Sequence, residues 1–313
     1  MVSIVIPIYN EEALLPRLNA EIRTVMDGLG EPSEVVYVND GSTDRSLDLL
    51  TTTHNQFPNT VVVADLSRNW GHQAAITAGL TLARGDAIIV MDGDFQDPPS
   101  LIGEMVAAWR GGAEVVIARR TGRGERGLRR ILFPLFYRAL GCLSNYPIPL
   151  NAGVFGLMDR KVCAVINDLQ ETNRFLPGLR SWVGFRTAFV DFDRPDRAAG
   201  TPKQTLGRLL KYGLDAILSF SYKPLRLGLA LGLITAAASM LAGLTLVYIR
   251  IRHLGIFRDN IVMGYTSLMC TVLFMASIQL ICTGILGEYI GRIYDEVKRR
   301  PLFVIRTVLQ RQP

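Results

Sequence analysis

Two long stretches without a single charged residue constrain the fold of this chain more than any other feature. They are Leu227–Ile249 and Asn260–Gly287. Each is longer than the roughly 20 apolar residues that a helix needs to cross a bilayer. A helix in the core of a soluble protein usually keeps a polar face, and neither stretch has one. The pair therefore predicts two transmembrane helices, with two buried core helices as the alternative.

Basic residues gather on both sides of these stretches. The chain carries 34 Lys and Arg against 28 Asp and Glu, a formal net charge of +6. Beside a membrane anchor, this excess favours anionic lipid and phosphate over nucleic acid as the partner. The positive-inside rule then places both chain ends in the cytoplasm and the loop between the stretches outside. The flanking basic residues are Arg208, Lys211, Lys223, Arg226, Arg292, Lys298, Arg299, Arg300, Arg306 and Arg311, and the loop carries Arg250, Arg252 and Arg258.

The first 120 residues alternate short apolar runs with helical patterns. Such alternation predicts an α/β fold, in which a mostly parallel sheet is covered by helices on both faces. The start of the chain, "SIVIPIY", has no basic segment or cleavage site of a signal peptide and is typical of a strand. The expected strands are Ser3–Ile8, Glu34–Asn39, Thr60–Asp65, Ala87–Met91 and Glu114–Ala118, and the expected helices include Glu12–Met26 and Gly71–Leu82.

Each expected strand runs directly into a polar cluster. The clusters are "PIYNEE", "NDGSTD", "SRNWGH", "DGDFQD" and "RRTGR". In open parallel sheets, ligands bind outside the carboxyl ends of the strands, so the five clusters predict one shared crevice. The chain has neither G-x-G-x-x-G after its first strand nor a P-loop, which disfavours a dinucleotide dehydrogenase or a P-loop kinase.

The fourth cluster contains a metal-binding pattern. Asp92 and Asp94 are two residues apart and point the same way in an extended chain. Carboxylate oxygens suit Mg²⁺ or Mn²⁺, and Gln96 offers a further amide oxygen. Mg²⁺ keeps positions open for substrate phosphates, so the pattern predicts a cation that holds a diphosphate. An exposed turn that happens to contain D-x-D is the alternative.

Two other clusters contain residues that suit a nucleotide. Asp40 can accept hydrogen bonds from a base or a ribose, although an ordinary Asp-Gly turn explains it equally well. Arg119, Arg120 and Arg123 can meet phosphate charge, or they form a solvated basic loop.

Four motifs, "SIVIPIYNEE", "VNDGSTD", "SRNWGHQAAITAGL" and "MDGDFQDPP", together resemble family 2 glycosyltransferases of the GT-A fold. The chain is most similar to the polyprenyl-phosphate branch, which includes dolichol-phosphate mannose synthase and the bactoprenol glucosyltransferases. "RPDRAAGTPK" and the two late apolar stretches strengthen the resemblance. It implies a donor site of Pro7, Tyr9, Glu11, Val38, Asp40, Asp92, Gly93, Asp94 and Arg119, a metal site of Asp92, Asp94 and Gln96, and phosphate or acceptor contacts from Arg123, Arg197 and Lys203.

The sequence departs from these relatives where many of them carry Asp-Phe-Arg-Leu. This chain has Val154-Phe155-Gly156-Leu157, so a candidate catalytic base is replaced by Val154. Asp97 and Asp159 are the carboxylates nearest in sequence to the two motifs, and Asp94 and Asp159 are the predicted catalytic residues. A local helix cap is the alternative for Asp159. A phosphate acceptor also needs no base if it attacks as the dianion, because its second pKa is about 6. Pro202 and Gln204 replace the Ser and Tyr that often flank Lys203.

The resemblance therefore implies an inverting hexosyltransferase that uses Mg²⁺ or Mn²⁺ and moves a sugar from a nucleotide-sugar to a polyprenyl (undecaprenyl) phosphate. UDP-glucose is the expected donor, while GDP-mannose, UDP-GlcNAc and aminoarabinose donors remain open. The alternatives are a processive polysaccharide synthase and a non-catalytic membrane scaffold that binds nucleotide-sugar. The relatives also make a homotetramer one expected assembly in the plasma membrane. The expected segments are a GT-A domain at 1–200, amphipathic juxtamembrane helices at 201–226, two transmembrane helices at 227–290 and a cytoplasmic basic tail at 291–313.

Overall fold

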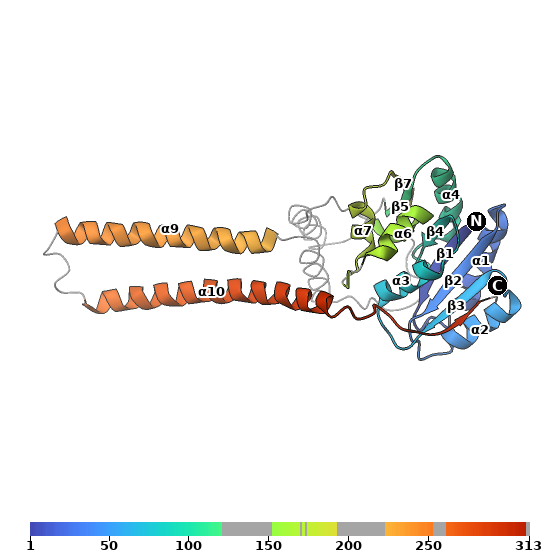
Figure 1. Cartoon of the computed structure of the whole chain (residues 1–313), viewed down its shortest axis with the longest axis horizontal. Coiled ribbons are helices and arrows are strands. Elements are labelled where there is room, and N and C mark those ends of the chain that lie inside the picture. The colour runs from blue at the N-terminus through green and yellow to red at the C-terminus, as the bar shows by residue number, and fades with distance from the viewer. Residues whose placement is uncertain (121–151, 170, 173, 193–222, 253–260, 311–313) are drawn as a thin grey trace.

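The structure is a computed structural model that describes residues 1–120, 152–169, 171–172, 174–192, 223–252 and 261–310 (Figure 1). Strands and helices alternate through the first half, and two long helices precede the last strand. The strands are β1 (Val2–Ile8), β2 (Ser33–Asn39), β3 (Val61–Leu66), β4 (Ala87–Val90), β5 (Val115–Arg120), β6 (Ala152–Asp159), β7 (Thr187–Phe192) and β8 (Ile305–Leu309). The helices are α1 (Leu15–Gly28), α2 (Ser46–Gln56), α3 (His72–Leu82), the 3₁₀ turn η1 (Pro99–Leu101), α4 (Ile102–Arg110), α6 (Arg160–Asp168), α7 (Leu176–Trp182), α9 (Lys223–Arg252) and α10 (Ile261–Val297).

The described strands form one mixed sheet in the order β7-β5-β6-β4-β1-β2-β3-β8. β1 pairs in parallel with β2 and β4, and β2 pairs in parallel with β3. β6 is antiparallel to both β4 and β5, so β4 and β5 point the same way, and β8 is antiparallel to β3. Six of the eight strands therefore end at one edge of the sheet, which we call the carboxyl edge. The predicted α/β fold with a mostly parallel sheet is confirmed.

Alternating side chains of the strands form a core on each face of the sheet. In β1, Val2, Ile4, Ile6 and Ile8 pack with residues of α1, α2 and α4. Val5 faces the other way and packs with residues of α3, α6 and α7. This period of two is the strand geometry that the apolar runs predicted.

The first five observed strands agree with the expected ones within a few residues, whereas β6, β7 and β8 were not expected. The expected fifth strand does not lie beside the fourth, because β6 inserts between them. β8 falls inside the segment expected as a basic tail, and it pairs with β3 at the opposite end of the sheet from β7. Its short run of residues lacks a clear period, and its pairing partner lies more than 200 residues away in the sequence.

The two long helices α9 and α10 lie side by side and extend away from the sheet (Figure 1). Most of the exposed large apolar side chains lie on these helices. Within the described residues, one helical segment, Thr271–Val297, is long and apolar enough to cross a membrane, and α9 contains a shorter apolar stretch, Gly228–Leu241. Two membrane-spanning helices were expected, and the described residues contain one segment that meets the length and hydropathy of a span. The expected amphipathic residues 201–222 lie outside the described part of the chain.

Candidate functional site

A pocket of about 210 Å³ opens at the carboxyl edge of the sheet. It lies where β1, β2 and β4 end, which is the position that the polar clusters predicted. Seven of the nine residues predicted to bind the donor line it, together with Ile8 and His72. A larger cavity of about 400 Å³ lies between α1 and α2, but no carboxylate lines it. The predicted donor residues in the pocket are Pro7, Tyr9, Glu11, Asp40, Asp92, Gly93 and Asp94.

Asp40 joins the two loops that form one wall of the pocket. Its Oδ1 accepts a hydrogen bond from the backbone N–H of Trp70 at 2.7 Å, and its Oδ2 accepts one from Gly71 at 3.0 Å. Burial raises the pKa of Asp40, and these two hydrogen bonds oppose the rise. Gly41 has a φ of +65°, and a Cβ there would lie 2.4 Å from the backbone carbon of Arg68. The two loops are therefore packed backbone against backbone, and both carboxylate oxygens of Asp40 are used in holding them together.

His72 is the pocket residue that the sequence analysis did not single out. It stands first in α3, and its Nε2 lies 2.8 Å from Oδ1 of Asp92. Burial alone lowers the pKa of His72, but the hydrogen bond to Asp92 and the neighbouring carboxylates outweigh burial and raise it. The signal was present in "SRNWGH", the cluster after the third strand, although one histidine in a polar loop is a common occurrence.

Asp92 and Asp94 both line the pocket, as their spacing predicts. Oδ1 of Asp94 accepts the backbone N–H of Gln96 at 3.1 Å, which folds the loop back on itself. Gln96 is almost buried and is not a lining residue. Among the described residues, no three His, Cys, Asp or Glu side chains gather to hold a metal. Two carboxylates are nevertheless a suitable set for Mg²⁺, which usually takes one or two and fills its other positions with water and substrate phosphates.

Asp97 lies beneath this loop and supports it. Only 1% of the residue is exposed, and Oδ2 accepts the backbone N–H of Asp92 at 3.1 Å. Its Oδ1 has no hydrogen-bond partner within the described part of the chain, and the nearest cation there is Arg120, at 4.0 Å. Burial, reinforced by the charge of Asp92, raises the pKa of Asp97 to about 7. Asp97 is thus a buried support for the loop and is not exposed in the way that a base for the acceptor requires.

A fully buried arginine occupies the space beside Asp97. Arg180 on α7 donates from its guanidinium to the backbone carbonyls of Gly153 and Val154 on β6. Burial lowers the pKa of Arg180 to about 10, while the charge of Asp97 raises it. A Cβ on Gly156 would lie 2.5 Å from Nη1 of Arg180, so glycine at this position makes room for the guanidinium.

The structure places two of the predicted donor residues away from the pocket. Val38 is fully buried and packs in the core beneath α3. Arg119 forms a two-pronged ion pair with Asp191, at 2.6 and 2.8 Å, on the exposed face of β5 and β7. Because side chains alternate along a strand, Arg120 points the other way, towards Asp97. Arg123, Arg197 and Lys203 lie outside the described residues.

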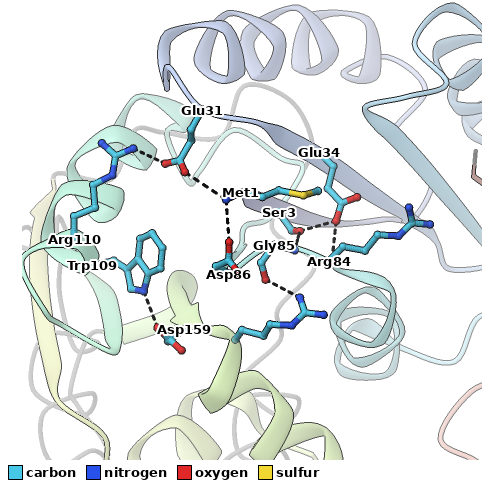
Figure 2. Close-up of polar contacts among 11 residues, drawn as sticks. Met1, Ser3, Glu31, Glu34, Arg84, Gly85, Asp86, Trp109, Arg110 and Asp159 are labelled. Carbon is cyan, nitrogen blue, oxygen red and sulfur yellow. Dashed lines mark hydrogen bonds and ion pairs between the residues drawn. The ribbon is translucent and has the colours of Figure 1, made fainter. Parts of the chain in front are cut away.

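Asp159, which was predicted to be catalytic, lies far from the pocket. Asp159 ends β6 and pairs with Ala87 at the start of β4, roughly 16 Å along the strand from Asp92 at about 3.3 Å per residue. Its side chain caps α6 by accepting the backbone N–H of Lys161, and it accepts the indole N–H of Trp109. Figure 2 shows Asp159 bonded to Trp109 in the same region as the polar contacts of Met1. Met1 precedes β1, so this region lies at the edge of the sheet opposite the carboxyl edge. The alternative interpretation as a helix cap is correct.

Comparison with known proteins shows the class to which this α/β fold with its carboxylate pocket belongs. Residues 3–166 match the model of glycosyl transferase family 2, and residues 223–293 match the GtrB C-terminal hairpin. The chain belongs to glycosyl transferase family 2 and is a glycosyltransferase.

The similar proteins match the chain over nearly its full length. An uncharacterized glycosyltransferase, YkcC, from Bacillus subtilis is 43% identical over 97% of this chain and 93% of its own. A prophage bactoprenol glucosyl transferase homolog from Escherichia coli is 38% identical over 98% of this chain and 99% of its own. The bactoprenol glucosyl transferase of Shigella phage SfII is also 38% identical, over 97% of each chain. These relatives support the polyprenyl-phosphate branch that the sequence motifs indicated.

Proposed function

We propose that this chain is a membrane-anchored, inverting glucosyltransferase that moves glucose from UDP-glucose to a polyprenyl phosphate. The observation that supports this most directly is the pocket at the carboxyl edge, which brings Asp92 and Asp94 together with Tyr9 and Asp40. Two of the similar proteins are named bactoprenol glucosyl transferase or its homolog, which favours a glucose donor and a lipid phosphate acceptor.

The donor binds with its diphosphate towards the loop that carries Asp92 and Asp94. A divalent cation bound there would supply positive charge to the leaving diphosphate. The residues suited to hold it are the two carboxylates, with His72 available as a hydrogen-bond donor to Asp92. Tyr9 is 45% exposed at the mouth of the pocket, where its ring offers a flat surface to the nucleobase.

The acceptor phosphate attacks the anomeric carbon from the opposite side, which inverts that centre. Neither of the two carboxylates nearest in sequence to the D-x-D pattern and the motif at 154–157 is placed to replace the missing base, since Asp97 is buried and Asp159 lies at the far edge of the sheet; Val154 itself packs against the core. A lipid phosphate is mostly a dianion at pH 7, because its second pKa is about 6, so its oxygen attacks without losing a proton first. Arg120 lies at the end of β5 on the pocket side, and we propose that it attracts one of the phosphates.

The long helical hairpin anchors the enzyme, with both helices crossing the membrane and the sheet domain in the cytoplasm. α9 has 30 residues and α10 has 37, so at 1.5 Å per residue each is longer than the roughly 30 Å hydrocarbon core. The exposed apolar side chains on both helices suit a lipid environment. Arg123, Arg197 and Lys203 remain proposed contacts of the donor or acceptor phosphates.

A panel of labelled donors tests the proposal. Membranes that contain the full chain are mixed with polyprenyl phosphate and with labelled UDP-glucose, GDP-mannose or UDP-GlcNAc. We expect label in the lipid extract with UDP-glucose above the other donors. A higher yield from GDP-mannose or UDP-GlcNAc would change the donor, and bound nucleotide without any lipid product would instead identify a binding scaffold.

A further inference from the structure

The last strand of the chain ties the end of the long hairpin to the wall of the pocket. β8 follows α10 after a short connection and pairs with β3, as the red strand beside β3 in Figure 1 shows. In this pairing Thr307 faces Asp65 and Ile305 faces Leu66, so Arg306 is an additional residue in a β-bulge. Bulges next to functional sites commonly redirect a side chain.

The bulged Arg306 makes two contacts at the carboxyl edge. Its Nη1 lies 3.1 Å from Oδ2 of Asp65, and its Nη2 donates to the backbone carbonyl of Ser67 at 2.8 Å. Asp65 is 8% exposed, whereas Arg306 is 61% exposed. The arginine therefore provides a charged partner for a nearly buried carboxylate at the end of β3.

These contacts continue into both loops that Asp40 joins. Oδ1 of Asp65 accepts a hydrogen bond from the side-chain amide of Asn39 at 2.7 Å, and Asn39 directly precedes Asp40. Ser67 begins the loop whose Trp70 and Gly71 N–H groups bind Asp40, and its hydroxyl accepts the indole N–H of Trp70. One guanidinium is thus linked to the base of each loop, directly at Ser67 and by way of Asp65 at Asn39, and it belongs to the strand that follows α10.

We propose that Arg306 is a positioning residue for nucleotide binding: through Asp65 and Ser67 it holds the loops around Asp40 in the geometry that receives the donor. This inference rests on the proposed function of the pocket. Removing Arg306 leaves the nearly buried Asp65 without its cation, so the carboxylate that binds Asn39 is no longer held in place from the other side. Because Arg306 touches no pocket residue itself, its loss weakens donor binding without removing a catalytic group.

The same strand provides a matched control at its other end. Arg84 donates from Nη2 to the side chain of Gln310 at 2.8 Å, and this contact holds β8 near the opposite edge of the sheet. The backbone N–H of Arg84 donates to the side chain of Glu34, as Figure 2 shows. This hydrogen bond does not depend on the Arg84 side chain, so shortening the side chain leaves it in place. Arg84→Ala therefore loosens β8 without reaching the loops around Asp40.

The experiment compares the full-length chain with Arg306→Ala, Arg306→Lys and Arg84→Ala in detergent with Mg²⁺. The dissociation constants of UDP and GDP are measured by calorimetry, and KM for the donor and kcat are measured with the best donor. We expect Arg306→Ala to raise the dissociation constant and KM about two- to tenfold, the range that one net hydrogen bond supports, with kcat nearly unchanged. Arg306→Lys keeps one charged contact and is expected to fall between wild type and Arg306→Ala.

Arg84→Ala is expected to bind nucleotide as wild type does, even where its melting temperature falls. Unchanged nucleotide affinity in Arg306→Ala, or an equal loss in Arg84→Ala, would overturn the inference while leaving the proposed function intact. If Arg306→Ala does not fold, Arg306→Lys decides: wild-type affinity in that variant contradicts the positioning role. Absence of UDP and GDP binding in the wild-type chain would overturn the proposed function and this inference with it.

Discussion

The buried carboxyl of Asp97 makes the stability of the protein depend on pH. Burial raises its pKa from an ordinary 3.8 to about 7, so the folded chain holds this proton more tightly than the unfolded chain does. The stabilisation is fully present below pH 4, and it is lost as pH rises towards 7, because the folded protein must then bury a charge. A difference of this size in pKa corresponds to on the order of 4 kcal/mol.

Asp97→Asn removes this titration and keeps the carbonyl that accepts the N–H of Asp92. In buffers with EDTA, we expect the variant and wild type to melt at similar temperatures near pH 4. At pH 8 the variant is expected to melt higher by roughly 5 °C or more, since 1 kcal/mol shifts the melting temperature of a domain of this size by about 2–4 °C. Scanning fluorimetry at intervals between pH 4 and 8 measures the difference in melting temperature. A difference in melting temperature between the variant and wild type that stays constant across this pH range would refute the assignment of the raised pKa to Asp97.

Three further predictions concern the site and its support. Asp92→Ala or Asp94→Ala should remove most turnover, because the leaving diphosphate loses its counter-charge, and full activity in both variants would exclude the metal site. Gly156→Ala should destabilise the fold by about 1–3 kcal/mol, because the new Cβ overlaps Arg180, whereas Gly103→Ala on open α4 should not; equal melting temperatures for the two variants would contradict the packing argument. Lys203→Ala should lower turnover with polyprenyl phosphate far more than it weakens nucleotide binding, and equal turnover in wild type and variant would remove Lys203 from the acceptor site.

The sequence predicted those parts of the fold that depend on local pattern. Uniform apolar runs identified β1 to β5, and their polar ends identified the edge that carries the pocket. β8 was missed because its pairing with β3 depends on a contact across most of the chain, for which a five-residue segment carries no local signal.

The sequence predicted the residues of the candidate site only where the evidence for them is local. Pattern and resemblance together found Asp92 and Asp94, since both signals act over a few residues. They chose Arg119 over Arg120, because only the pairing of β5 with β7 decides which side chain faces Asp191 and which faces Asp97. The location of Asp159 was unpredictable for a similar reason: it is close in sequence to the motif at 154–157, but β6 carries it to the far edge of the sheet.

The most direct test of the account measures sugar transfer to two acceptors that differ only in the phosphate. Purified full-length chain is incubated with labelled UDP-glucose and Mg²⁺ or Mn²⁺, and either polyprenyl phosphate or the matching polyprenol is added. We expect labelled lipid from polyprenyl phosphate alone, its loss in EDTA, and its return when the cation is restored. Transfer to polyprenol at an equal rate, or undiminished transfer in EDTA, would contradict attack by a lipid phosphate at a metal-dependent carboxylate pocket.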